Sequence, residues 1–259
     1  MHELLLFGLV PRARHEQVLK ILAGVAAMQP QRVLERHVVY KPQREPDEPG
    51  SNIRRGASQG IVQKQAKQTA ARDLYFTHMV QTLTEDDFKE QKSQAPWTHQ
   101  FNDVPDTGDR GVTVRMVSGT DFVEGDPHAY MAAFGNNFVS EHYMDGHRYV
   151  HKNILILLHQ VLTEPGPRSA EQSPKPSLPT FDSLTPLDPS GTYILQASIR
   201  VVDNGSPALI DLGVEELKAF KNLMKGCVEL DAPDRLVLDT RVKYQARPFA
   251  NLQPPAAAA

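Results

Sequence analysis

The sequence predicts a mainly β protein, a multi-stranded antiparallel β-barrel with two or three helices packed outside it. About eight short segments are β-branched or alternate apolar and polar residues, as strands do. Two of them, residues 3–10 and 153–162, are apolar on both alternating faces and therefore need cover on two sides. Helical patterns are few and do not alternate with the strands, which argues against a parallel α/β sheet.

Composition restricts the class of protein further. The chain has 259 residues, which fits one large domain or two small ones, and 40% hydrophobic and 23% charged residues are typical of a globular protein. A net charge of −3 provides no field that would attract nucleic acid or an anionic membrane. A single cysteine, Cys227, predicts a reducing compartment, because one thiol cannot form an internal disulfide. We expect no signal peptide and no membrane span, since no apolar run approaches about 18 residues.

The strands are expected where β-branched or alternating residues run between Pro, Gly or polar stretches. The clearest is 192–203, where apolar and polar side chains alternate throughout. A hairpin is expected within 138–153, because Asp145-Gly146 is a strong two-residue turn signal. The other predicted strands occupy residues 3–10, 31–41, 72–83, 110–119, 153–162 and 234–244.

Three segments have the periodicity of helices. Residues 15–28 place Val18 and Leu22 at helical spacing, and 125–135 carry a proline in the first turn. Residues 213–228 turn one apolar face inward and end near Gly226. The acidic segment 84–90 is predicted to be an exposed helical turn. The inward residues of the third helix are Leu217, Phe220 and Met224.

We expect one barrel domain over residues 1–252, interrupted twice. Residues 42–70 are polar and broken by Pro and Gly, which predicts a long loop. Residues 164–191 are rich in Pro and Ser, bury little apolar surface and are predicted to be disordered. Residues 253–259 form a predicted disordered tail.

Three histidines within ten residues, His142, His147 and His151, suggest a metal site. A turn at Asp145-Gly146 would put all three on one face of the hairpin. However, His147 and His151 would then lie about 13 Å apart, whereas zinc binds nitrogen at about 2.1 Å. Glu141 and Asp145 would point to the other face. The sequence therefore favours a structural hairpin with half-buried histidines, and only a different turn register would leave the metal site open.

Other chemical candidates are weaker. Residues 56–60, "GASQG", match the Gly-x-Ser-x-Gly pattern of hydrolases but lack the apolar strand that must precede it. Cys227 follows a helix C-terminus, where the helix dipole disfavours a thiolate, so core packing is the expected role. We therefore predict no catalytic, metal or cofactor-binding residues and no cofactor, and we name no partner-binding residues.

Seven segments stand in an order that matches one known family: "MHELLLFGLVP", "QVLKILAGVAAMQPQ", "VLERHVVYKP", "GASQ", "FVSEHYMDGHRYVHKNILILLHQVL", "YILQASIRV" and "DAPDRLVLDTRVK". On these segments the chain resembles subunit 18 of the Mediator complex of RNA polymerase II in its filamentous-fungal form. The Pro-rich insert and the C-terminal tail have no counterpart.

The resemblance implies a non-catalytic nuclear subunit of the Mediator head module. It implies a heterodimer with Mediator subunit 20 and a tether through a helix of subunit 8. Through the complex it implies contact with RNA polymerase II and the general initiation factors, and no direct sequence-specific nucleic acid contact. The barrel is akin to that of triphosphate-tunnel enzymes, which suggests a metal-dependent phosphohydrolase as the alternative. Those enzymes need a Glu-x-Glu pair on a strand, and no Glu-x-Glu occurs in this sequence, where "LERH" offers a lone Glu35.

Overall fold

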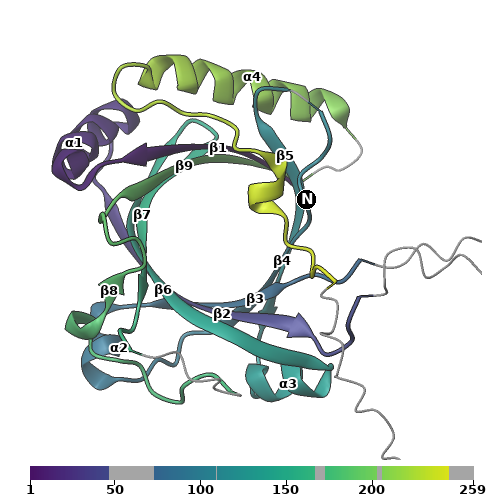
Figure 1. Cartoon of the computed structure of the whole chain (residues 1–259). Helices are drawn as coiled ribbons and strands as arrows, with labels where there is room; N and C mark the ends of the chain where they lie inside the picture. Colours follow the sequence, from purple (N-terminus) through teal and green to yellow (C-terminus); the bar gives the residue numbers. More distant parts are fainter. Residues whose placement is uncertain (47–72, 109, 167–172, 203–205, 245–259) are drawn as a thin grey trace, which may run out of the picture.

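The computed structural model describes residues 1–46, 73–108, 110–166, 173–202 and 206–244, which form a closed antiparallel β-barrel (Figure 1). The sheet order is β6-β2-β3-β4-β5-β1-β9-β7-β8, and a β6–β7 pairing closes eight strands into a ring with β8 outside it. This confirms the predicted fold class. The strands are β1 (His2–Val10), β2 (Gln31–Pro42), β3 (Thr77–Leu83), β4 (Trp97–Asn102), β5 (Thr113–Phe122), β6 (Asn136–His151), β7 (Ile154–Thr163), β8 (Thr185–Pro186) and β9 (Tyr193–Val201).

The helices pack on the outside of the barrel, as predicted (Figure 1). The segment predicted at 213–228 begins earlier, because Pro207 supplies the first turn. No helix within the described residues is both long and apolar enough to cross a membrane. The α-helices are α1 (His15–Ala26), α2 (Glu85–Glu90), α3 (Pro127–Ala133) and α4 (Pro207–Met224), and the short 3₁₀ helices are η1 (Arg12–Arg14), η2 (Phe181–Ser183) and η3 (Arg235–Leu238).

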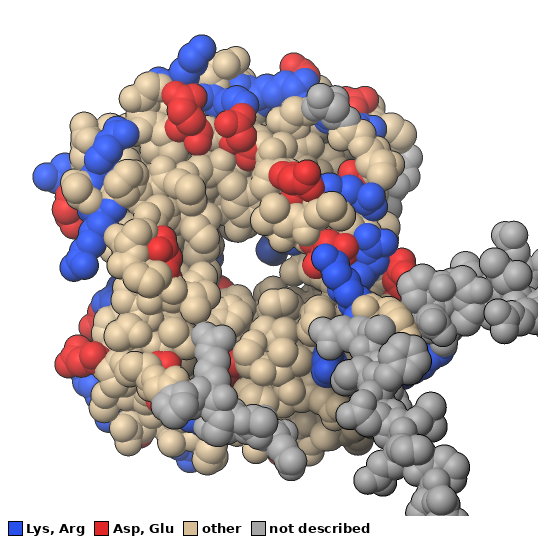
Figure 2. All heavy atoms as spheres, viewed as in Figure 1, with Lys and Arg blue, Asp and Glu red and all other residues tan. Residues whose placement is uncertain are grey.

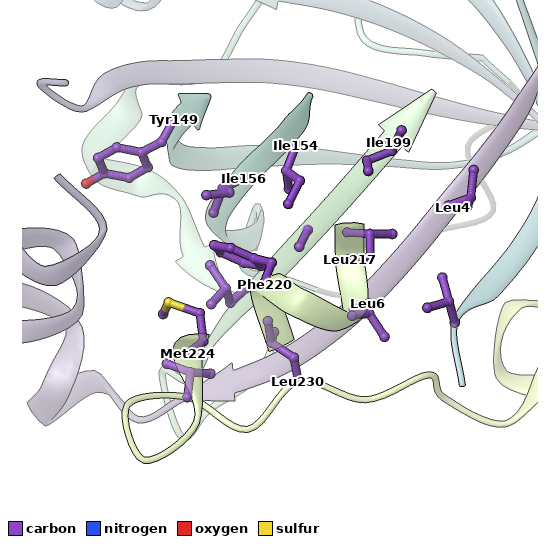
Figure 3. Packing of buried hydrophobic residues seen from close by; sticks show 14 of the residues in the cluster. Leu4, Leu6, Tyr149, Ile154, Ile156, Ile199, Leu217, Phe220, Met224 and Leu230 are labelled. Atoms are coloured by element: carbon purple, nitrogen blue, oxygen red, sulfur yellow. The ribbon is translucent and has the colours of Figure 1, made fainter. Parts of the chain in front are cut away.

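The main hydrophobic core lies between the barrel wall and α4, outside the lumen (Figure 3). Leu4 and Leu6 of β1 are fully buried against Leu217 and Phe220 of α4. Since side chains alternate along a strand, Glu3 and its neighbours two residues on face the lumen instead. The strands that are apolar on both faces are thus covered on the outside by the helices of this chain.

The prediction of a hairpin with its turn at Asp145-Gly146 is wrong. The strand β6 runs without interruption through these residues, and the turn falls at Lys152-Asn153, where Lys152 has a φ of 55°. Gly146 is needed for a close approach rather than for a turn. A Cβ atom there would lie 2.5 Å from Cβ of His159 and 2.6 Å from the carbonyl oxygen of Leu158 on β7.

We expect Gly146→Ala to destabilise the protein by about 1–3 kcal/mol, because the added methyl forces β6 and β7 apart in a closed barrel. Urea denaturation of both proteins measures the free energy of unfolding. Gly24→Ala is the matched control, since a Cβ at that helical position meets no other atom within 4 Å. Equal loss in the two variants would contradict the steric explanation.

The prediction of a strand at residues 234–244 is also wrong. These residues form η3 and an extended segment, which pairs with residues 74–76 through an isolated bridge between Tyr75 and Arg241. Thr240 also donates a hydrogen bond to the carbonyl oxygen of Asn102 at the end of β4. The Asp234 carboxylate accepts a hydrogen bond from the backbone N–H of Leu236 and so starts the 3₁₀ turn. The remaining barrel strand is β4, which the sequence analysis missed. All six of its residues are half-buried.

Part of the insert predicted to be disordered is folded. Residues 173–191 contain η2 and β8, and Leu178 is only 3% exposed. Leu178 packs in a second cluster with residues such as Phe88 and Tyr143. A single well-placed leucine thus anchors a Pro-rich segment to the barrel wall, so the prediction is wrong for 173–191. Residues 167–172, most of the predicted loop 42–70 and the tail 253–259 lie outside the described residues.

The helical turn predicted at 84–90 is α2, and Thr84 caps it. Thr84 Oγ1 accepts a hydrogen bond from the N–H of Asp87 at 3.2 Å, and the Asp87 carboxylate accepts one from the N–H of Thr84 at 2.7 Å. We expect Thr84→Ala to cost about 1 kcal/mol of unfolding free energy, with Thr84→Ser as the control that keeps the cap. An unchanged urea midpoint in the alanine variant would show that the cap contributes nothing.

Candidate functional site: the barrel lumen and the hairpin histidines

The three hairpin histidines do not share a face, contrary to the prediction. On the continuous strand β6, His142 points into the lumen, while His147 and His151 point outward. The ring of His142 stacks on His37 of β2, with centroids 5.1 Å apart. The cause is the position of the turn. With the turn at Lys152-Asn153, all three histidines lie on one continuous strand. His142 is an odd number of residues from each of the other two, and odd separations place side chains on opposite faces of a strand.

The two outward histidines hold α1 against the barrel. His151 Nδ1 lies 2.9 Å from the carbonyl oxygen of Val25, and the ring of His147 lies 6.0 Å from that of His15. Burial lowers the pKa of both His15 and His147. Beside them is a cavity of about 290 Å³, into which Asp145 projects, but its carboxylate is already bonded to Arg32 at 3.1 Å. These contacts are those of a packing interface.

Four histidines from four strands meet inside the barrel. We call them the lumen histidines: His37, His78, His142 and His159. His37 is central, with its Nε2 2.9 Å from Glu35 Oε2 and its ring 6.4 Å from that of His78. His159 is 8% exposed. Its Nδ1 atom is buried without a hydrogen-bond partner in the described part of the chain.

The environment keeps two of these histidines neutral near pH 7. Burial, with smaller contributions from the neighbouring His37 and Arg115, lowers the pKa of His78 to about 4. Burial also lowers the pKa of His159 to about 4, although a hydrogen bond with the Leu157 backbone partly opposes this. His78 and His159 therefore carry neutral imidazole rings at physiological pH.

The acidic side chains of the lumen are engaged by basic ones. Glu3 is 3% exposed, and its carboxylate accepts hydrogen bonds from Arg115 Nη2 at 2.7 Å and Arg200 Nε at 3.2 Å. Two guanidinium groups thus offset the cost of burying one carboxylate. Figure 2 shows the lumen as an opening at the centre of the molecule, with charged side chains close to it.

Neither face offers a metal centre. Within the described ranges, no three His, Cys, Asp or Glu side chains are placed to hold one ion together. Glu3 and Glu35 lie on different strands, and each is occupied by a cationic or imidazole partner. Carboxylates that act in general acid–base catalysis must be free to reach a substrate. Glu3 and Glu35 instead stabilise the barrel through these contacts.

Two further candidates from the sequence analysis were Cys227 and the "GASQG" segment. Cys227 packs against the main core, as predicted, and burial raises the pKa of its thiol. The "GASQG" segment, with Ser58, lies outside the described residues. The sequence analysis missed one feature, a row of exposed apolar side chains on the outer face of α4. Its spacing is visible in the sequence, but only the inward face of that helix was considered.

The fold and these contacts define a small closed antiparallel β-barrel protein with helices outside and a lumen of paired charges and clustered histidines. The family model described as Med18 protein matches residues 2–241, and the chain belongs to this family. The resemblance to the filamentous-fungal form is thereby confirmed.

Relatives match over nearly the whole chain. The chain is 36% identical to Mediator of RNA polymerase II transcription subunit 18 of Neosartorya fischeri, covering 94% of this chain and 100% of the relative. It is 36% identical to the protein of the same name from Coccidioides immitis, with the same coverage. Among solved structures, a chain of the Schizosaccharomyces pombe Mediator head module shares the fold with a TM-score of 0.66 and 19% identity, covering 93% of this chain and 100% of that one.

Proposed function

We propose that this protein is a non-catalytic structural subunit of the Mediator head module that helps to transmit regulatory signals to RNA polymerase II. The observation that carries the proposal is the family match over residues 2–241, which includes every barrel strand. Relatives named as Mediator subunit 18 support it because they align over their full length.

The lack of a catalytic role rests on the contacts in the lumen. Glu3 is held by two arginines and Glu35 by His37, so neither is free to act on a substrate. The alternative, a metal-dependent phosphohydrolase that uses the hairpin histidines, requires His142, His147 and His151 to converge. They lie on opposite faces of β6, and no observation favours this alternative.

The proposed partners are other Mediator subunits. By the family resemblance, subunit 20 pairs with this barrel and a helix of subunit 8 tethers it to the head module. Contact with RNA polymerase II and the initiation factors then runs through the complex, in the nucleus. A net charge of −3 supports binding to proteins rather than directly to nucleic acid or membranes.

Affinity purification of the tagged chain from nuclear extract, with mass spectrometry of the co-purifying proteins, tests the proposal. We expect stoichiometric recovery of Mediator subunits, including subunits 20 and 8. The Phe220→Ala variant, whose core is damaged, is the control and should recover far less of the complex. Recovery of the intact chain without any Mediator subunit would refute the proposal, as would stoichiometric metal together with phosphate-releasing activity.

A further inference from the structure

The strand β5 has one edge that is only partly used. β1 pairs with this edge at residues 113–116, and β4 pairs with the opposite edge at residues 117–122. Val117 also bonds to Met1 on the first edge, its N–H donating at 3.0 Å and its carbonyl oxygen accepting at 3.2 Å. Among the described residues, no strand pairs with this edge beyond that point. We call residues 118–122 on this side the β5 open edge, which begins beside the N-terminus (Figure 1).

The backbone of the β5 open edge presents a regular row of hydrogen-bonding groups. Backbone directions alternate along an antiparallel strand, so Gly119 and Asp121 point their N–H and C=O groups to the same side as Val117. Ser118 and Thr120 point theirs to β4 instead. These four residues of the open edge are exposed, so the outward groups of Gly119 and Asp121 are accessible to solvent. Such a row is the template on which a further β-strand binds.

The β5 open edge lacks the usual protection against an added strand. Natural edges are commonly blocked by lysine, by proline or by a bulge. Residues 117–122 contain neither residue type, and their pairing with β4 shows no shift in register. The one charged side chain among them, Asp121, accepts a hydrogen bond from Thr98 on β4 at 2.7 Å. The backbone of this edge is therefore open to another chain.

Exposed apolar side chains lie at both ends of the open edge. Met116 is 46% exposed at the end beside Met1, and Val123, directly after the strand, is 91% exposed. The ring of Tyr130 on α3 packs edge-on against Phe122 and is itself 47% exposed. Apolar side chains of an added strand would be buried against these residues, which supplements the backbone hydrogen bonds.

Charge selects which kind of strand fits. Carboxylates stand at positions 121, 124 and 126, and the sequence has no lysine or arginine from 116 to 147. Two copies of this chain, paired through their open edges about Thr120, would place their Asp121 carboxylates on diagonal positions about 7–8 Å apart, where they repel each other. A strand of a different protein with a basic residue directly opposite Asp121 forms an attractive pair instead.

We infer that the β5 open edge binds one extended segment of another protein chain as an added antiparallel β-strand. The residue of that strand opposite Asp121 is basic, and those opposite Thr120 and Phe122 are β-branched or apolar. The added strand continues the line of β1 and has its C-terminal end beside Met1, because β1 pairs with the same edge in the antiparallel direction. This inference does not depend on the proposed function.

Amide hydrogen exchange of the purified protein with a synthetic peptide, followed for single residues by NMR, tests the inference. The probe is acetyl-Val-Lys-Val-Thr-Val-amide, whose five residues align with Phe122 back to Ser118. We expect saturable binding with a Kd of about 1 mM or tighter. Saturating peptide should slow exchange of the Gly119 and Asp121 amides by about ten-fold or more. The amides of Ser118 and Thr120, already bonded to β4, should not change.

Matched peptides separate strand addition from binding by side chains alone. N-methyl groups on the lysine and threonine, opposite Asp121 and Gly119, remove the N–H groups that point to β5 and should abolish binding. N-methyl groups on the second and third valines, whose N–H groups point away, should leave it intact. Glutamate in place of lysine should weaken binding, and the Asp121→Lys protein should prefer the glutamate peptide over the lysine peptide.

Four results would each overturn the inference. These are no binding of the probe, equal binding of the two methylated peptides, equal slowing at all four amides, and a peptide-free protein whose Gly119 and Asp121 amides already exchange as slowly as those of Ser118 and Thr120. The last result would mean that the edge is already paired, by this chain or by a second copy. Recovery of Mediator subunits is measured separately, so the proposed function stands or fails independently of these results.

Discussion

The protein is expected to lose several kcal/mol of stability as the pH falls from 6.5 to 4. His78 and His159 have pKa values lowered to about 4 in the folded barrel, mainly by burial. In the unfolded chain a histidine has a pKa of about 6.5. Within this interval the unfolded chain therefore binds more protons than the folded protein, and acid favours unfolding.

The size of the effect follows from the two shifts. Each histidine contributes at most about 3 kcal/mol, because one pKa unit corresponds to about 1.4 kcal/mol. The full stability is present above pH 6.5 and is lost progressively toward pH 4. Burial lowers the pKa of His15, His99, His128 and His147 as well, so the outer contacts act in the same direction.

Urea denaturation at pH 7.5, 6.0 and 5.0 measures this loss. Replacing His78 or His159 with Gln removes one titrating group, so each variant should show a flatter dependence of unfolding free energy on pH than the parent. The value at pH 7.5 gives the separate cost of altered packing. A parent protein with constant stability between pH 7.5 and 5.0 would contradict the lowered pKa values, because the folded and unfolded states would then bind equal numbers of protons.

Local patterns in the sequence were sufficient to predict many of the strands that form the barrel wall. Alternation identified β9, the apolar run of residues 3–10 identified β1, and the spacing of Val18 and Leu22 identified α1. These signals depend on neighbours only a few residues away. They predicted the fold class because antiparallel strands without alternating helices have few ways to bury their apolar faces.

The errors arise where distant pairings decide the outcome. Asp145-Gly146 is a turn signal in isolation, but in the barrel Gly146 lets the strand pass close to His159, 13 residues away. The segment 234–244 is rich in strand-forming residues, yet the ring is already closed by β6 and β7 and offers it no place. The lumen histidines come from four strands, so the register of the whole barrel must be known before they can be grouped. Only His142 was a candidate beforehand.

Alanine substitution on the inner face of α4 is expected to destabilise the protein strongly, whereas on the outer face it is expected to have little effect. Phe220 is 2% exposed within the main core, so Phe220→Ala should cost about 3–5 kcal/mol through lost burial and an unfilled cavity. Leu212 lies about two helical turns from Phe220 and is 66% exposed. The Leu212→Ala substitution should therefore change the stability of the isolated protein by less than about 0.5 kcal/mol. Urea denaturation of both variants, without any partner chain, checks the difference. A large loss in Leu212→Ala would mean that the Leu212 side chain packs within this chain in solution. A small loss would show that the stability contributed by α4 comes from its inner face, where Phe220 packs in the main core.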